Sequence, residues 1–412
     1  MFNKPTLTRL PTELHFEIAN HLRVNANWSD LCALSLSCSL FRHIAQKALY
    51  TSIEISHQMP QLEKIHCNYE HDYGSEPGLD EASSRAAIDS PTLAHPLRIL
   101  ASGVTEHHDL LRHVRTLIID CGCYPGCEHN VLIIQIANLF LDHLFNMTGL
   151  RGLELRNTLI IESDIYSGII ALACHSLQEI TLDLAYPPVV SLQSLADHDS
   201  EPLLCTRLDI FMDAEDLSEF YVWFLNRCRL LTVLSLRGDI LEILTSIKGL
   251  TFRNLDRLEI ESGSTELAEP LSAFLQSNPS VINLHLCIPV IVGSDITLSE
   301  DSLPNLRSIH APIQVLCKLL PGRPIVKIRS DLKNPDPQIG LVPQLIDAVG
   351  LSSASVIEEF AVGVSPMEDL DRTLEKVLEC MKSVKHLRLH DLPHDGKVWP
   401  ISLASAGLTA AG

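Results

Sequence analysis

The sequence predicts an α/β fold in which a small helical module precedes a long array of repeated strand and helix units. Residues 10–50 carry apolar side chains at helical spacing. An apolar-x-x-apolar-x-apolar motif then recurs from residue 114 to residue 389, with steps of 24 to 28 residues between the middle positions from Leu153 to Ile309. Such a period holds one strand and one helix, and stacked units of this kind form a solenoid with a parallel sheet.

The N-terminal module is expected to contain three short helices. The apolar positions of the first helix recur every four residues: Leu10, Leu14, Ile18 and Leu22. Pro11 suits the first turn of that helix, where its missing N–H costs nothing. Ser29 or Asp30 can cap a second helix, and a third follows Ser39. Three helices of this size form a marginal core alone, so part of their apolar surface should meet a partner.

The same stretch resembles the F-box. The likeness is carried by Leu10-Pro11-Thr12-Glu13-Leu14, Ile18, Leu22, the run from Asp30 to Arg42, and Ala48-Leu49-Tyr50, an ending common in fungal members. The family's pattern is Leu-Pro-x-Glu-Leu, an Ile, a Leu, Asp-Leu, a Leu, then Val-Cys and an aromatic residue followed by Arg. Two features depart from it: a longer spacer, Arg23 to Ser29, precedes Asp30, and Ser37 replaces the Val.

The resemblance implies that the module binds a Skp-family adaptor and, through it, a cullin–RING ubiquitin ligase. The residues expected to contact the adaptor are Leu10, Pro11, Glu13, Leu14, Ile18, Leu22, Leu31, Leu34, Cys38 and Phe41. The chain would then be the substrate-recognition subunit of an SCF-type ligase. Two alternatives stay open: a scaffold that binds the adaptor without delivering a target for ubiquitylation, and a metal-binding or enzymatic repeat protein whose module only caps the solenoid.

The repeat motif sets out the expected strands. Its middle positions are Leu117, Leu153, Ile180, Leu208, Leu234, Leu258, Leu284, Ile309, Phe360 and Leu387, with a weak unit around Val326 and Ile328. Helical spacing is found at 219–226, 270–276 and 370–381. The period is that of leucine-rich repeats, and the region resembles the degenerate arrays of many fungal F-box proteins, with parallel strands on the concave side and helices on the convex side. An ordinary α/β domain is the alternative.

Composition divides the chain into four parts. Residues 5–50 form the F-box, 51–112 a flank that includes the first strand and a mobile acidic insertion at 67–96, 113–392 the repeat array, and 393–412 a frayed tail. The insertion is rich in Gly, Ser, Pro, Asp and Glu and lacks a sustained apolar period. Within the tail, residues 402–412 are small and nearly uncharged.

Strand alternation predicts which side chains face the concave side of the array, where an unknown target protein would bind. The candidates are Glu154, Arg156, Asp209, Phe211, Arg237, Glu259, Glu261, Lys327, Arg329 and Arg388. The row becomes basic toward its end, and Phe211 is the expected aromatic anchor. A solvated sheet face without a partner is the alternative for each of these residues.

One short segment carries residue types that bind metals. Cys121, Cys123, Cys127 and His129 could offer three thiolates and an imidazole to zinc. Their spacing matches no common C-x-x-C pair arrangement, so a Cys-rich loop between a strand and a helix is the preferred interpretation. The sequence contains no Gly-x-Ser-x-Gly elbow, P-loop or dinucleotide fingerprint. We therefore expect neither enzyme activity nor a cofactor.

Charge and targeting signals narrow the classes of partner. The chain has 31 basic and 51 acidic residues and a net charge of −20. This balance disfavours a nucleic-acid backbone or an anionic membrane surface as the main partner. Met1 to Leu10 lacks the pattern of a signal peptide, and Val131 to Phe145 is interrupted by polar residues and falls short of a membrane span. We expect a protein of the cytoplasm or the nucleus.

Overall fold

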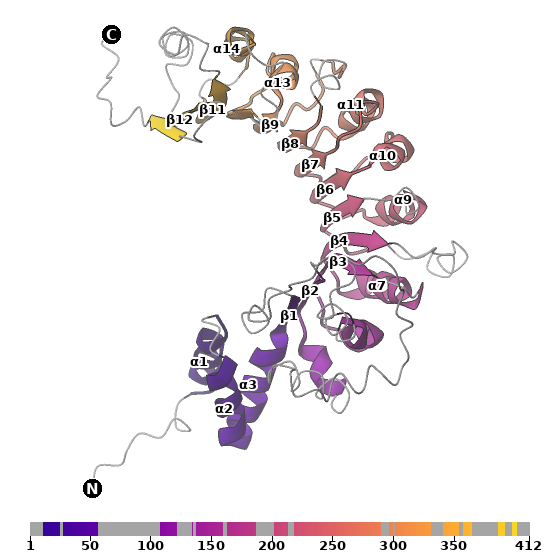
Figure 1. Cartoon of the computed structure of the whole chain (residues 1–412), viewed down its shortest axis with the longest axis vertical. Helices are drawn as coiled ribbons and strands as arrows, with labels where there is room; N and C mark the ends of the chain where they lie inside the picture. The colour runs from indigo at the N-terminus through magenta and orange to yellow at the C-terminus, as the bar shows by residue number, and fades with distance from the viewer. Residues whose placement is uncertain are drawn as a thin grey trace, which may run out of the picture. The chain divides into compact units, whose positions relative to one another are not determined.

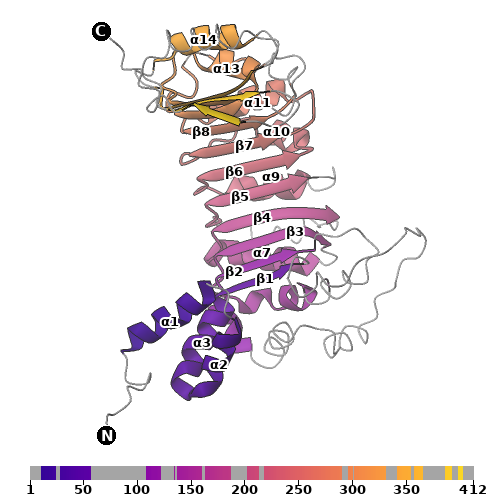
Figure 2. The same cartoon turned by 60° about the vertical axis from the view of Figure 1, so that its left-hand side comes forward.

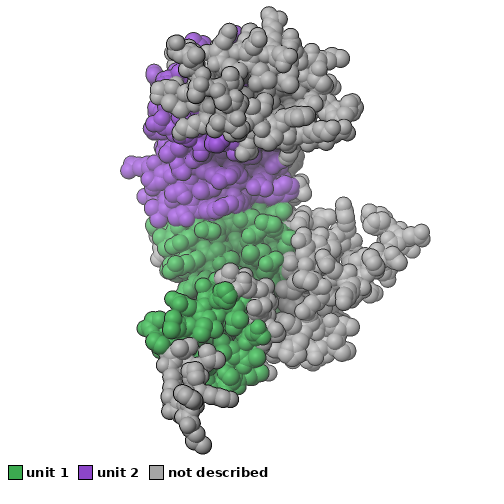
Figure 3. Space-filling view, turned by 90° about the vertical axis from the view of Figure 1, so that its left-hand side faces the viewer, with its two compact units in different colours: residues 1–205 green, residues 206–412 purple. Residues whose placement is uncertain are grey.

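The computed structural model describes residues 11–24, 28–56, 108–121, 134, 137–159, 163–186, 202–212, 218–289, 296–299, 301–330, 341–353, 357–364, 386–391 and 398–401. The chain divides into two compact units, residues 1–205 and residues 206–412, which are coloured separately in Figure 3. Each unit combines parallel strands with helices that cover one face of the sheet (Figure 1).

Unit 1 begins with the three predicted helices. They are α1 (Thr12–Val24), α2 (Trp28–Ser37) and α3 (Ser39–Thr51), so the second helix starts slightly before the expected cap residues. The carbonyl of Pro11 accepts a hydrogen bond from the Leu14 N–H at 3.1 Å, which opens α1. The small core of the module consists of Ala19, Leu31, Ile44 and Ala45, with Leu22, Leu34, Ala48 and Leu49 packed against it.

The sheet of unit 1 follows directly from α3. Its elements are β1 (Ser52–Ser56), η2 (His108–His113), β2 (Thr116–Asp120), η3 (Leu144–Asn146), β3 (Gly152–Leu159), α7 (Ser163–His175) and β4 (Glu179–Tyr186). Adjacent strands are parallel from β1 to β4, with Leu117 opposite Leu153 and Leu153 opposite Ile180. These aligned residues are buried, and they form a continuous apolar row beneath the sheet.

Unit 2 repeats the strand–helix alternation. Its elements are β5 (Arg207–Met212), α9 (Ser218–Arg227), β6 (Val233–Gly238), α10 (Leu241–Ile247), β7 (Arg257–Glu261), α11 (Ala268–Ser277), β8 (Asn283–Cys287), β9 (Ser308–Ala311), α13 (Ile313–Leu319), β10 (Lys327–Ser330), α14 (Val342–Gly350), β11 (Glu359–Val364), β12 (His386–Asp391) and β13 (Val398–Ile401). The strands from β5 to β12 pair in parallel, and β13 pairs antiparallel with β12. Figure 2 shows β5 to β8 as successive rungs of this sheet.

One turn in unit 2 requires glycine. Gly238 ends β6 with φ at 89°, in the left-handed region, and a Cβ atom there would collide with the carbonyl oxygen of Met212 on β5. The next residue, Asp239, donates its N–H to that same carbonyl at 2.9 Å. The absence of a side chain at Gly238 therefore lets two neighbouring repeats approach each other closely.

The α/β repeat solenoid predicted from the motif is confirmed. Strands occupy every predicted position, including the weak unit, which becomes β10, and α9 and α11 cover the predicted helices at 219–226 and 270–276. The expected helix at 370–381 and the insertion at 67–96 lie outside the described residues. β13 was not predicted, and it lies within 393–412, where a frayed tail was expected. No helix in the described part of the chain is long and apolar enough to cross a membrane.

Candidate partner-binding surfaces

The three-helix module exposes several large apolar side chains. The exposed fractions are 40% for Leu14, 40% for Phe16, 78% for Leu36 and 41% for Leu40. They make up four of the eight large apolar side chains that are exposed in the described ranges. Exposed apolar area that gathers on one short segment is typical of a docking surface, whereas scattered single residues need no explanation.

The residues predicted to contact an adaptor do not all reach that surface. Leu14, Pro11 and Glu13 are exposed, and Ile18, Leu22, Leu34 and Cys38 are half-buried. Leu31 and Phe41 are buried within the module, with 0% and 3% exposure, so they shape its core. Their contacts with an adaptor stay a prediction. Leu10 lies outside the described residues.

A buried histidine explains why the inner face of α1 differs from the predicted stripe. His15 is almost fully buried, and its ring meets the Phe41 ring edge-on at 4.7 Å between centroids. Ala19 and Leu22 follow it at helical spacing and also face the core. The inward face is therefore His15, Ala19 and Leu22, which turns Leu14 outward. The signal for this face was the spacing of His15 from Ala19 and Leu22, which an apolar-only search passes over.

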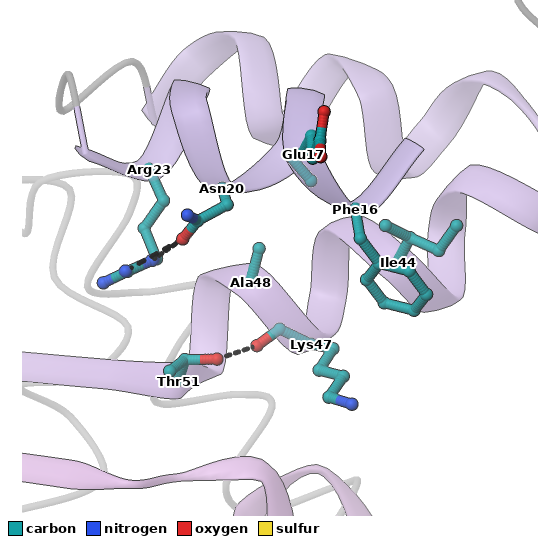
Figure 4. Close-up of a pocket in the computed structure, with 9 residues that line it drawn as sticks. Phe16, Glu17, Asn20, Arg23, Ile44, Lys47, Ala48 and Thr51 are labelled. Atoms are coloured by element: carbon teal, nitrogen blue, oxygen red, sulfur yellow. Dashed lines mark hydrogen bonds between the residues drawn. The ribbon is translucent and has the colours of Figure 1, made fainter. Parts of the chain in front are cut away.

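A groove of about 330 Å³ lies between α1 and α3 (Figure 4). Its lining residues are Phe16, Glu17, Ala19, Asn20, Arg23, Ile44, Lys47, Ala48 and Thr51. The Lys47 ammonium lies 5.5 Å from the centre of the Phe16 ring, and Arg23 donates to the Asn20 side-chain oxygen at 3.0 Å. The groove thus has an apolar floor and a rim on which two cations, Arg23 and Lys47, outnumber the one acid, Glu17, an arrangement that suits an amphipathic segment of a partner.

Positive charge continues from the groove to η2. The pKa of His113 is lowered, first by burial and then by the nearby charges of Arg112, His43, Lys47 and Arg115. The rings of His43 and His113 are 6.0 Å apart. A histidine whose neighbours disfavour its protonated form indicates a locally positive potential on this side of the module.

The sheet face of unit 2 holds most of the residues predicted to bind a target. Its central row runs across neighbouring strands in the order Asp209, Ser235, Glu259, His285, His310 and Arg329. Arg207 donates to Asp209 at 3.1 Å, and Arg257 donates to Glu259 at 2.7 Å. Toward β11, Arg329 binds Glu359 through two N–H donors at 2.8 and 3.1 Å. Most charges on this face therefore belong to local ion pairs.

The other predicted target-binding residues are placed unevenly. Arg237 is exposed, donates to Ser235 at 3.2 Å and lies 3.8 Å from a Glu259 oxygen. Phe211 is half-buried at the register position beside Arg237, so it is less exposed than an aromatic anchor was expected to be. Glu261 and Lys327 are exposed on β7 and β10. In unit 1, Glu154 and Arg156 form an ion pair on β3. The side chain of Arg388 lies outside the described residues.

The segment with metal-binding residue types is described only at its first cysteine. Cys121 is buried directly after β2, and its N–H donates to the Arg156 carbonyl at 3.0 Å. Cys123, Cys127 and His129 lie outside the described residues. Within the described ranges, no group of three or more His, Cys, Asp or Glu side chains could hold a metal ion. The zinc hypothesis for this segment stays a prediction.

Comparison with known proteins finds similarity in structure alone. No family model matches the sequence. No curated protein matches it either. Among solved structures, a chain from the crystal structure of the Rad7 and Elc1 complex in yeast is similar with a TM-score of 0.40. The two are 11% identical over 77% of this chain and 84% of that chain.

Proposed function

We propose that this protein is the substrate-recognition subunit of an SCF-type cullin–RING ubiquitin ligase. In this proposal the three-helix module binds a Skp-family adaptor, and the repeat array binds a target protein. The observation that carries it is the exposure of Leu14, Leu36 and Leu40 on a module whose sequence resembles an F-box. Burying these side chains against adaptor helices would supply the apolar area that the small module lacks by itself.

The proposal assigns no bond-making chemistry to this chain. A target held on the repeat array and a ligase held through the module would share one assembly, which raises the effective concentration of the target beside the ubiquitin-transfer machinery. The catalytic groups would belong to other subunits. The protein would act where such ligases act, in the cytoplasm or the nucleus.

Co-purification with a Skp-family adaptor tests the proposal. The double variant Leu14→Asp, Leu36→Asp places two charges on side chains that are already exposed, so the module should still fold. We expect the wild-type chain to retain the adaptor, and we expect the variant to lose at least about tenfold in affinity, because buried carboxylates without partners are costly at an interface.

The matched control is Leu351→Asp, which places the same charge on a side chain that is 65% exposed next to α14. It should bind the adaptor like the wild type. A wild-type chain that captures no adaptor, or a double variant that captures it unchanged, would reject the proposal. Circular dichroism of each variant shows whether the helices persist.

A further inference from the structure

Three neighbouring strands of unit 2 carry no acid at their outward positions, in contrast to β5 and β7. At outward positions β8, β9 and β10 present Asn283, His285, Ser308, His310, Lys327 and Arg329, which we call the β8–β10 patch. These six positions hold no carboxylate, whereas on β5 and β7 the outward acids Asp209 and Glu259 bind arginines. The chain as a whole has a net charge of −20. A run of strands without outward acids is therefore locally less negative, and this part of the surface favours an anionic partner.

Two stacked imidazoles form the centre of the patch. The rings of His285 and His310 lie face to face, 4.3 Å between centroids and 3° from parallel. They occupy opposite positions on adjacent strands and are both half-buried. Each ring carries an N–H group that can donate a hydrogen bond to an anion. The stacked pair therefore places two such groups side by side at the centre of the patch.

Lys327 supplies a charge that has no ion-pair partner among the described residues. Its side chain is exposed on β10, and within the described part of the chain its ammonium forms neither an ion pair nor a hydrogen bond. Its neighbour Arg329 is bound to Glu359, and on the other side of the patch Glu259 is bound to Arg257. Two of the acids that border the patch, Glu259 and Glu359, are thus already engaged, so they compete little with an incoming anion.

We propose that the β8–β10 patch binds an anionic segment of the target protein, carried by consecutive Asp or Glu side chains or by a phosphorylated side chain. The inference rests on the proposed function, since it names the chemistry of the target. Strands lie about 4.8 Å apart, so three strands span about 10 Å, the reach of about three extended residues. Ammonium groups form charge-assisted hydrogen bonds with carboxylate or phosphate oxygens, and imidazole N–H groups donate to the same acceptors.

Binding of labelled peptides to the full-length protein tests this proposal. The probes are a peptide with four consecutive Glu, a peptide with one phosphoserine, and a peptide with four Gln. Their binding is measured by fluorescence anisotropy. We expect at least one anionic peptide to bind about tenfold more tightly than the Gln peptide and to weaken as salt is added. The anionic peptide that binds more tightly shows whether carboxylates or a phosphate group of the target supply the negative charge.

Two variants address the patch directly. Lys327→Glu should weaken the anionic peptide at least about tenfold, and the double variant His285→Asn, His310→Asn at least about fivefold. The matched control is Arg253→Glu, which likewise reverses the charge of an exposed side chain, in the turn before β7. This control should bind the peptide within about twofold of the wild type.

Several outcomes would overturn the proposal. Equal binding of the Gln peptide, no binding of either anionic peptide, or equal losses in Lys327→Glu and Arg253→Glu would each do so. Adaptor capture is measured separately, through the module. A chain that captures the adaptor but not the anionic peptides would reject the β8–β10 patch alone, and a chain that binds the peptides but no adaptor would reject the proposed ligase role alone.

Discussion

Arg323 shows how one buried side chain can hold several segments of unit 2 together. Its guanidinium donates to the carbonyls of Ser299 at 2.6 Å, Ser302 at 2.8 Å and Leu319 at 3.0 Å, and the residue is only 2% exposed. In addition, its own carbonyl accepts a hydrogen bond from the Ser352 hydroxyl at 2.7 Å. The planar fork of donors thus ties the turn before β9, the end of α13 and the end of α14 to one residue.

Replacing Arg323 should therefore cost more than its charge suggests. We expect Arg323→Met to lower the free energy of unfolding by about 3 kcal/mol, because it leaves several buried carbonyls without donors. Arg323→Lys should recover only part of this loss, since a single ammonium cannot span the same acceptors. Urea unfolding measures both. Arg253→Met, at an exposed position, serves as the control, and equal stability of the Arg323 and Arg253 variants would contradict the prediction.

His113 should make unit 1 less stable in acid. Its pKa in the folded protein is lowered by burial and by Arg112 and other cations, so between that value and its ordinary value near 6.5 the unfolded chain binds more protons. Stability therefore rises with pH across this window and falls as the pH drops through it. We expect His113→Gln to reduce the loss of melting temperature between pH 7 and pH 5.

The titration of His113 itself can be followed by NMR. Arg112→Gln removes a positive neighbour and should move the His113 pKa upward, toward its ordinary value. Arg229→Gln, an exposed cation in the turn after α9, should leave it unchanged. A His113 titration that does not respond to the Arg112 change would contradict the assigned cause.

At the scale of elements, Asn278 connects one repeat to the next. It follows α11, is fully buried, and accepts the Phe252 N–H at 2.7 Å while donating to the carbonyls of Leu250 at 3.0 Å and Phe274 at 2.8 Å. Ser280 adds a hydrogen bond from its hydroxyl to the Phe252 carbonyl at 3.0 Å. The irregular turn between α10 and β7 thus gains partners for its buried backbone groups from the following repeat.

We expect Asn278→Ala to lower the free energy of unfolding by about 2–3 kcal/mol, because it leaves the Phe252 N–H and two carbonyls unpaired. Hydrogen exchange should show the loss of protection first in the turn around Phe252. Asn226→Ala removes an exposed hydrogen bond to the Val222 carbonyl and is the matched control, with an expected cost below about 1 kcal/mol. Uniform loss of protection throughout unit 2 would argue against a local role for Asn278.

The strands were predictable from sequence because two patterns coincide in them, the two-residue alternation of a strand and the recurrence of the motif once per repeat. Alternate residues such as Leu258 and Ile260 are buried, and the same pair recurs once per repeat. The module was harder to predict, because the inward face of α1 contains His15, which packs against Phe41, in place of an apolar residue. β13 pairs with β12 through main-chain bonds, which side-chain patterns do not report. The β8–β10 patch depends on register across strands, and a single strand does not reveal it.

At the scale of the whole molecule, the charge balance sets how the protein responds to salt. The chain carries a net charge of −20, and the ion pairs on its sheet faces, such as Arg207 with Asp209, involve exposed arginines. Exposed pairs contribute about 0–1 kcal/mol each, and salt weakens them. Repulsion among the excess carboxylates opposes folding, and salt weakens that as well. The sign of the salt effect shows which of the two is larger.

We expect the repulsion to be larger, because the excess of acids is spread over the chain while the pairs gain little in water. Raising NaCl from about 0.02 to 0.5 M, which shortens the screening length from about 20 Å to about 4 Å, should raise the melting temperature at pH 7.5 by a few degrees. Near the isoelectric point of about 5.3 the net repulsion vanishes, so the same salt step should leave the melting temperature unchanged or lower it. A fall in melting temperature with salt at pH 7.5 would mean that the ion pairs on the sheet faces stabilise the fold more than their exposure suggests. Changes at Arg207 or Arg257 would then weaken the array itself, and those positions would be unsuitable for testing target binding.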